Sequence, residues 1–578
     1  MIKTLLKSVR SYKKESLLAP LFVSLEVVLE CLLPLIMAEL IDRMTGQTMG
    51  PIMKLAIVLV IMALLSLTCG ILSGRMAAIA SCGFAKNLRQ DLFYRIEEFA
   101  FADIDHFSTS SLVTRMTTDV TNVQNAYQML IRVAIRTPLM IIFSIIMCIT
   151  INPKMSLIFL CLLPLLGVVL FGIAIHVHPI FKRIFKKYDA LNNSVQENIS
   201  AIRVVKSFVR EDYEKKKFKK AAEEVCEDFT SVEKILAINT PFMMFCIYAA
   251  FLLVSCFGAN IIIKTAGSDL TTGQLSSLIN YGVQILSSMM MLSMVFVMTS
   301  MASESANRIV EVLTWDNTLS SPENGLTEVS DGSISFENVS FKYHAKSKKS
   351  ALADVNLEIA SGQTIGIMGG TGASKTTMIQ LISRLYDVTE GSVRVGGYDV
   401  REYDLNTLRD AVAVVLQKNV LFSGTIKENL RWGNKNATDE ELVNACKAAQ
   451  ADEFIEQFPD KYDTYIERGG TNVSGGQKQR LCIARALLKK PKILILDDST
   501  SAVDTKTDAL IRNAFRTSIP DTTKLIIAQR VSSVQDADMI LVLDDGRIVE
   551  RGTHEELLQK HGIYWEAYET QTKSREAV

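Results

Sequence analysis

Six stretches of about 20 mostly apolar residues lie within the first 301 residues of this chain, and they limit its fold more than any other feature. A helix needs roughly 20 apolar residues to cross the hydrocarbon core of a bilayer, so each stretch predicts one membrane-spanning helix. Basic residues before the first stretch, after the second and after the fourth predict that these segments and both chain ends are cytoplasmic. The predicted spans are residues 17–41, 51–72, 133–151, 155–175, 241–263 and 275–301.

The composition places a soluble region after this membrane region. The chain has 578 residues, 48% of them hydrophobic, and apolar runs crowd the first half whereas charged residues crowd the second. Lys+Arg (62) and Asp+Glu (62) balance, so nothing indicates a nucleic-acid partner. The ten cysteines are scattered without paired spacing, which predicts neither a disulfide framework nor a zinc site. No small-residue cleavage site follows the basic start, so we expect a cytoplasmic flank rather than a signal peptide.

A polar segment, residues 314–332, separates the two regions and carries Pro322, Asn324 and Gly325. After it comes an alternating strand, and from Thr364 strands alternate with helices, a pattern typical of α/β domains. We therefore predict a membrane all-α domain at residues 1–313, a linker at 314–332, and an α/β domain with an antiparallel β subdomain at 333–578. The long polar stretches after the second and fourth spans contain few Gly or Pro residues, so we expect these helices to continue into the cytoplasm.

A glycine-rich turn follows the predicted strand at residues 364–368 and opens a helix. Glycines let backbone N–H groups close on phosphate oxygens, and the helix N-terminus adds a positive dipole. Lys375 is expected to reach the β- and γ-phosphates of ATP, and Thr376 to ligate Mg²⁺. Ser374 stands where this pattern usually has glycine, and its Cβ is expected to perturb the loop without abolishing binding. The predicted phosphate-binding residues are Gly369, Gly370, Thr371, Gly372, Ala373, Ser374, Lys375, Thr376 and Thr377.

A second motif covers residues 472–504. A Gly-rich turn opens a basic helix, Pro491 marks a break, and a buried strand at residues 493–496 delivers Asp497 and Asp498 at its carboxyl end. P-loop proteins hold Mg²⁺ beside the phosphates of ATP with a carboxylate in this position. Asp497 is therefore the predicted metal ligand.

Together these motifs resemble an ABC-type ATPase, and nearly the whole chain is similar to the type IV ABC exporters of drugs, lipids and peptides. The resemblance implies that Gln417 belongs to the Q-loop and contacts Mg²⁺, and that adenine stacks on Tyr343. It also implies that the signature motif contacts the γ-phosphate of ATP held by the opposite subunit. The signature residues are Ser474, Gly475, Gly476 and Gln477.

The same resemblance implies two cytoplasmic coupling loops in the membrane domain. Residues 106–120 resemble the first coupling helix and the ascent from it. Residues 194–212 resemble the second, with a short transverse helix near 207–213.

Two further positions depart from the family's pattern. Asp498 occupies the place of the catalytic glutamate, and Gln529 the place of the switch histidine. Aspartate is one methylene shorter, and a misplacement of about 1 Å can cost roughly 10²-fold in rate. Glutamine can hydrogen-bond a γ-phosphate but cannot supply the charge of a protonated imidazole. With Ser374, these changes lie on the Walker side, whereas the signature is intact.

This asymmetry resembles the degenerate half of a heterodimeric exporter. The expected function is ATP-driven export of a hydrophobic or amphipathic substrate, with hydrolysis mainly where this chain's signature completes a partner's site. That partner would be a second half-transporter carrying the glutamate and the histidine. The alternatives are a homodimeric exporter with slow ATPase activity and an ATP-gated regulatory membrane protein. The expected location is a bacterial plasma membrane, with both termini and the nucleotide-binding domain in the cytoplasm.

Two carboxylates in the first predicted span, Glu26 and Glu30, lie four residues apart and so share one helix face. Carboxylates inside a membrane are costly and usually face a cavity or a partner. They are candidates for binding a cationic substrate, but a hydrogen-bonded role in helix packing is favoured.

Overall fold

The computed structural model describes residues 1–44, 49–344, 347–499 and 501–576. The chain forms two compact units, the first made of Met1–Glu98 and Ser108–Trp315, and the second of Phe99–Phe107 and Asp316–Val578. The second unit therefore includes a short segment, Phe99–Phe107, that the sequence assigned to the membrane domain.

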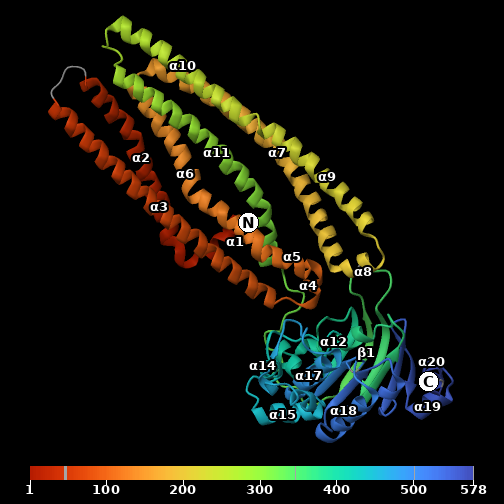
Figure 1. The fold of residues 1–578 in the computed structure, drawn as a ribbon. Helices are drawn as coiled ribbons and strands as arrows, with labels where there is room; N and C mark the ends of the chain where they lie inside the picture. Colours follow the sequence, from red (N-terminus) through yellow and green to blue (C-terminus); the bar gives the residue numbers. More distant parts are fainter. Residues whose placement is uncertain (45–48, 345–346, 500, 577–578) are drawn as a thin grey trace. The chain divides into compact units, whose positions relative to one another are not determined.

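The first unit is built of long helices, which confirms the predicted membrane all-α architecture (Figure 1). Among the described residues, 6 helices are long and apolar enough to cross a membrane, and each contains one predicted span. In the apolar window of α3 (Met49–Glu97) only 6% of the residues are buried, so its outer face is available to lipid or to a partner. The remaining helices are α1 (Ile2–Leu6), α2 (Lys13–Met44), α5 (Thr109–Thr114), α6 (Val120–Ile151), α7 (Pro153–Ser200), α8 (Ile202–Ser207), α9 (Glu211–Leu236), α10 (Asn239–Thr265) and α11 (Thr272–Leu313).

The helices of the first unit pack through small residues and a few interhelical hydrogen bonds. α2, α3, α6 and α11 lie against one another, and α7 and α10 pack on each other and on α11 (Figure 1). The Tyr281 hydroxyl donates to the Cys31 carbonyl oxygen at 2.6 Å, joining α11 to α2. A Cβ added to Gly273 would lie 2.1 Å from the Ala38 carbonyl oxygen, so glycine permits this close approach.

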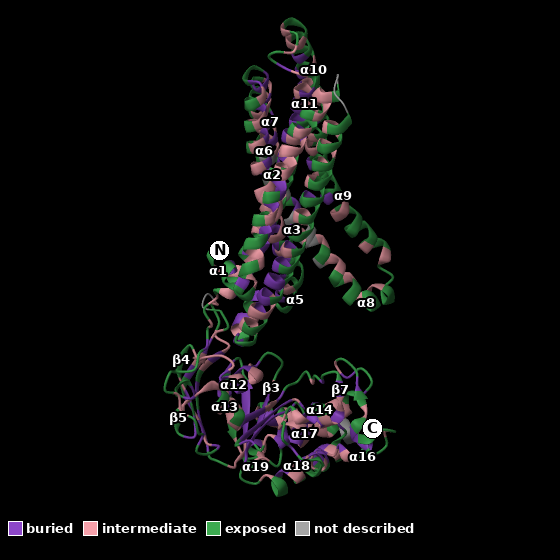
Figure 2. Cartoon of the chain, turned by 90° about the vertical axis from the view of Figure 1, so that its left-hand side faces the viewer, coloured by how far each residue is buried: buried purple, intermediate pink, exposed green. Residues whose placement is uncertain are grey.

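The helices that contain the second and fourth predicted spans, α3 and α7, do continue well beyond those spans, and α11 continues beyond the sixth. One predicted position is wrong: the short helix near residues 207–213 is α8 (Ile202–Ser207), which ends where we expected it to begin. It follows a break at Ala201, whose φ and ψ of −96° and 14° are not helical. α8 is mostly exposed, so no burial pattern in the sequence marked its position (Figure 2).

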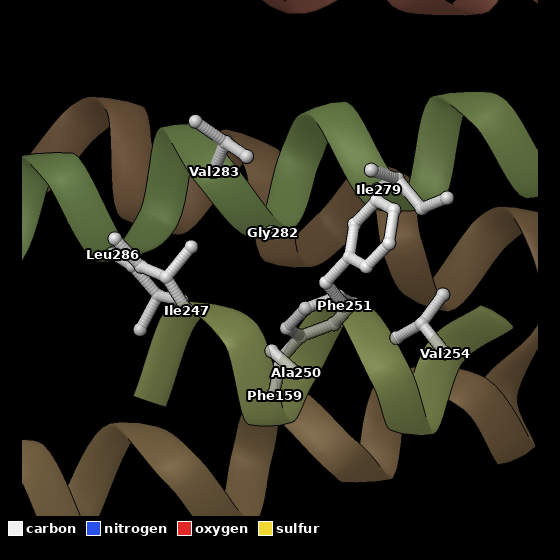
Figure 3. Close-up of a pocket in the computed structure, with 9 residues that line it drawn as sticks. All are labelled: Phe159, Ile247, Ala250, Phe251, Val254, Ile279, Gly282, Val283 and Leu286. Carbon is white, nitrogen blue, oxygen red and sulfur yellow. The ribbon is translucent and has the colours of Figure 1, made fainter. Parts of the chain in front are cut away.

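A cavity between α7, α10 and α11 shows how tightly the first unit packs (Figure 3). Its wall includes Phe159 and Gly282, and a Cβ on that glycine would lie 2.6 Å from Cε1 of the phenylalanine. The volume is about 10 Å³, room for about one water molecule, and the wall is apolar. This cavity is packing space and not a substrate site.

The second unit has an α/β architecture with two main sheets, as predicted. One is antiparallel, in the order β2-β1-β4-β5. The other has the order β12-β11-β3-β10-β9-β6, in which every neighbouring pair is parallel except β11 with β12. The strands of the larger sheet are mostly buried, and β3, β9 and β10 lie in its middle (Figure 2).

The strands are β1 (Ile334–Phe341), β2 (Leu352–Ile359), β3 (Thr364–Gly369), β4 (Glu390–Val395), β5 (Tyr398–Asp399), β6 (Val412–Val415), β7 (Gly424–Thr425), β8 (Tyr465–Ile466), β9 (Ile493–Asp497), β10 (Thr523–Ile527), β11 (Met539–Asp544) and β12 (Arg547–Gly552). The helices are α4 (Phe101–Phe107), α12 (Lys375–Ile382), α13 (Leu405–Ala411), α14 (Ile426–Arg431), α15 (Asp439–Ala448), α16 (Asp452–Ile455), α17 (Gly475–Leu488), α18 (Thr505–Ser518), α19 (His554–Gln559) and α20 (Ile563–Glu576).

Candidate functional site

Four parallel strands of the larger sheet end at one edge, and each is followed by predicted site residues. The phosphate-binding loop follows β3, Gln417 follows β6, Asp498 follows β9, and Gln529 follows β10. Ligand sites of α/β proteins lie at this carboxyl edge, because the loops that leave the strands meet there. The topology therefore gathers residues that are more than 150 positions apart in the sequence.

The loop after β3 requires unusual backbone angles. Gly369 has a φ of +147°, and a Cβ there would lie 2.2 Å from the Leu543 carbonyl oxygen. Gly372 has a φ of +84°. Ser374 also lies in the left-handed region, with φ and ψ of 68° and 25°, a conformation that costs an L-residue roughly 1–2 kcal/mol. The glycine missing at this position would have avoided that strain.

Lys375 and Thr376, the first two residues of α12, make the polar contacts of the loop. The Lys375 ammonium group donates to the carbonyl oxygens of Gly369 and Gly370, both at 2.8 Å. Burial lowers the pKa of Lys375, and the charges of Asp497 and Asp498 oppose this shift. The Thr376 hydroxyl donates to Asp497 Oδ2 at 2.9 Å, which joins the loop to the end of β9.

The residues at this edge fit a hard divalent cation. Mg²⁺ prefers oxygen ligands, and Thr376, Asp497 and Gln417 offer a hydroxyl, a carboxylate and an amide oxygen. Asp497 is 3% exposed, and burial raises the pKa of its carboxyl group, while the Thr376 hydrogen bond opposes the shift. A cation would offset the cost of keeping this carboxylate ionised.

Asp498 is held by two amide side chains. Gln529 Nε2 donates to Asp498 Oδ2 at 3.0 Å, and Gln417 also hydrogen-bonds this carboxylate. Burial raises the pKa of Asp498, and the two hydrogen bonds and Lys375 oppose the shift. The structure thus brings the two substituted positions, Asp498 and Gln529, into direct contact with each other, and Gln417 contacts Asp498.

Tyr343 lies two residues beyond β1 and is 45% exposed. Its hydroxyl is 2.9 Å from the Thr377 hydroxyl and donates to Gln380 Oε1 at 3.2 Å, so the ring is fastened to α12. Burial raises the pKa of this phenol. An exposed ring next to the phosphate loop is well placed for stacking on a nucleobase.

The signature residues form the N-terminus of α17. Ser474 is the N-cap: its hydroxyl accepts from the Gln477 amide at 3.3 Å, and the Gln477 side chain accepts from the Ser474 amide at 2.9 Å. Ser474 and Gly475 are exposed, so the positive end of the helix dipole faces outward. In the described part of the chain, residues 474–477 make no hydrogen bond to the phosphate loop, Asp497 or Asp498.

The membrane carboxylates have a partner that the sequence interpretation missed. Arg136 on α6 contacts Glu26, and its second amino group donates to both oxygens of Glu30 at 2.9 and 2.7 Å. An added Cβ on Gly70 of α3 would lie 3.0 Å from Glu26 Oε1, so glycine leaves room for this carboxylate. These contacts support the packing role. A lone arginine within a predicted apolar span was the signal for this ion pair.

Comparison with known proteins agrees with this architecture. Residues 17–290 match the ABC transporter transmembrane region, and residues 352–501 match the ABC transporter family model. The uncharacterized ABC transporter ATP-binding protein YfiB of Bacillus subtilis is 36% identical over 98% of both chains. An uncharacterized ABC transporter ATP-binding protein of Mycobacterium tuberculosis is 32% identical over 99% of both.

A solved structure of a bacterial Atm1-family ABC exporter with ATP bound shares the fold, with a TM-score of 0.85 and 24% identity. The match covers 97% of this chain and 98% of that chain. Six membrane helices joined to an ATP-binding α/β domain define an ATP-hydrolysing membrane transporter. Its fold is that of the ABC exporter structure. The chain belongs to the ABC transporter family, as a multi-pass half-transporter whose fold implies dimerisation.

Proposed function

We propose that this chain is the degenerate-site half of a heterodimeric ABC exporter. The observation that carries the proposal is the contrast within its ATPase domain: the signature helix has an intact capping box, whereas Asp498 and Gln529 replace the catalytic pair. The chain would bind ATP at its own loop and lend residues 474–477 to the partner's consensus site. The substrate would be hydrophobic or amphipathic.

The geometry of the carboxyl edge supports the proposed nucleotide-binding roles. Loop amides from residues 369–377 and Lys375 would bind phosphate oxygens, and adenine would stack on Tyr343. The residues that would hold Mg²⁺ are Thr376, Gln417 and Asp497. The ion would neutralise phosphate charge. We assign residues 1–313 to the transmembrane domain, 314–332 to the linker and 333–578 to the nucleotide-binding domain, which would lie in the cytoplasm of a bacterial cell.

The state of Asp498 supports slow hydrolysis at this chain's own loop. A general base must reach the attacking water, and such catalysis typically contributes about 10²–10⁴-fold. Asp498 has the shorter carboxylate side chain and is already bonded to two amides. If Asp498 took a proton from the water, neither glutamine amide could then accept that proton from it.

The first experiment is a mild-detergent pull-down of the tagged chain from its native membrane, with subunit stoichiometry from mass spectrometry. The expected result is a second half-transporter at one to one, carrying glutamate and histidine where this chain has Asp498 and Gln529. Recovery of this chain alone as a dimer would refute the heterodimer.

Reversion of both substituted positions tests the same proposal by rate. Asp498→Glu with Gln529→His should change the ATPase rate of a heterodimer by less than about threefold, since its other site already works. A homodimer should gain roughly 10²-fold or more. Asp410→Glu, at a carboxylate whose side chain is 83% exposed, is the matched control.

A further inference from the structure

The helix α20 of the second unit contacts the strand edge of the candidate site. Gln571 on this helix bonds to the backbone on both sides of Arg530. Its Nε2 donates to the Gln529 carbonyl oxygen at 3.0 Å, and its Oε1 accepts from the Val531 amide at 2.9 Å, across 42 and 40 positions of sequence. Because Gln529 is one of the two substituted positions, α20 is in direct contact with the candidate site.

The backbone that Gln571 holds is extended. Arg530 has φ and ψ of −91° and 127°, so the carbonyl group before it and the N–H group after it point to the same side, as in a strand. A side-chain amide has one acceptor and two donor hydrogens, and it can therefore satisfy both groups at once. The Arg530 guanidinium donates to the carbonyl oxygens of Val503 and Ser501 at 3.1 and 3.2 Å. The segment after β10 is thus held by α20 and by the loop after β9.

α20 is itself fixed at its first turn. The Glu550 carboxylate of β12 accepts from the amides of Ile563 and Tyr564 at 2.6 and 3.2 Å. Tyr564 is 1% exposed, and its hydroxyl is 2.7 Å from His554 Nδ1 of α19. A helix rises about 1.5 Å per residue, so Gln571 lies roughly 12 Å along α20 from this anchor. The position of Gln571 is therefore set by β12 and α19.

We propose that Gln571 is a positioning residue for Gln529. It fixes the backbone from which the Gln529 side chain extends to Asp498 and from which that side chain would reach the γ-phosphate of ATP. A group on a fixed backbone loses less conformational freedom when it binds a ligand, so it binds more tightly. Because ADP lacks the γ-phosphate, Gln571 contributes to the preference of this chain's loop for ATP over ADP. The inference rests on the proposed binding of ATP at that loop.

Nucleotide competition at this chain's own loop measures that preference. The transporter is purified from its native membrane, kept on ice with Mg²⁺ to slow hydrolysis, and photolabelled with an azido-ADP analogue that is read for each subunit. The ATP or ADP concentration that halves the labelling is then determined. Gln571→Met keeps the length and helix propensity of the side chain but removes both hydrogen bonds. The halving concentration of ATP should rise about fivefold, and that of ADP should stay within about twofold.

A double variant separates this role from a general effect on the stability of α20. Since Gln571 acts through Gln529, Gln529→Ala should lose the preference for ATP at least as strongly, and the addition of Gln571→Met should cause no further loss. Thr572→Ala is the matched control, because the Thr572 hydroxyl donates to the Tyr568 carbonyl oxygen of its own helix at 2.8 Å. This control should leave both halving concentrations unchanged.

Three results would overturn the inference: an unchanged preference for ATP in Gln571→Met, equal losses for ATP and ADP, or additive losses in the double variant. A parent protein whose own loop is labelled but not protected by ATP gives a different result. That outcome refutes the proposed binding of ATP at this loop, and the role of Gln571 with it.

Discussion

The N-terminus of α17 and the carboxyl edge of β9 and β10 belong to the same ATPase domain but are built differently. At α17, Ser474 and Gln477 cap the helix reciprocally through neighbouring backbone groups. At the strand edge, Gln417 and Gln529 come from two other segments, and each hydrogen-bonds Asp498. The first arrangement leaves Ser474 and Gly475 exposed at the helix N-terminus, whereas the second uses its polar groups for contacts with one another.

This difference indicates at which of the two sites a substitution should reduce turnover more. An exposed helix N-terminus binds anions without help from the rest of its own domain, so it can serve a neighbouring subunit. A carboxylate held by two amides is stable but less available to a water molecule. The comparison predicts that substitutions at α17 reduce turnover far more than substitutions at the strand edge.

The largest effect is expected for Ser474→Ala. Removal of one preorganised donor to a developing charge typically costs about 10²–10³-fold, so ATPase activity of the assembled transporter should fall by roughly 10²-fold. Steady-state phosphate release from the purified transporter measures this loss. Thr438→Ala is the control, because Thr438 caps α15 with Glu441 in the same way but lies outside the site. Equal losses in the two variants would mean that helix stability, and not ATP contact, explains the effect.

Lys375→Ala should have a smaller effect. The variant loses the ammonium group that lies over the phosphate loop, so nucleotide binding at this chain's own loop should weaken strongly. Total ATPase activity should fall less than about tenfold, since the proposed heterodimer hydrolyses ATP mainly at its other site. Photolabelling with an azido-ATP analogue, read for each subunit, separates binding from turnover. A loss as large as that of Ser474→Ala would mean that this chain's own loop matters as much for turnover as α17 does, and it would favour a homodimer.

The two regions also differ in how well the sequence predicted them. The start of α17 at a Gly-rich turn and the loop at residues 369–377 each depend on contiguous residues, so local patterns sufficed to predict a turn that opens a helix at both places. The six spans were predictable because a bilayer demands a minimum apolar length. The contacts of Asp498 with Gln417, and of Arg136 with Glu26 and Glu30, depend on which segments become neighbours, and spacing along the chain does not encode that.

Gln529→Ala tests how much the hydrogen bond to Asp498 at the strand edge matters for turnover. The substitution removes one donor from Asp498, so the pKa of this carboxyl group should rise further above its usual value. In the proposed heterodimer, where this site would contribute little to turnover, ATPase activity should change by less than about twofold at neutral pH. A tenfold loss would show that Gln529 contacts the reacting phosphate and would place hydrolysis at this chain's own loop.

Ser374→Gly should produce the smallest effect, and one on stability rather than on rate. Relief of the left-handed strain at Ser374 is worth roughly 1 kcal/mol after the greater chain entropy of glycine is subtracted, which raises the melting temperature by about 2 °C. Asp545→Gly is the control, because Asp545 also has a positive φ, 46°, but lies in the turn between β11 and β12. Both variants should gain stability, and only Ser374→Gly should also bind ATP more tightly. A tenfold gain in ATPase activity for Ser374→Gly would contradict the comparison, because the loop and not the Asp498 edge would then limit this chain's own site.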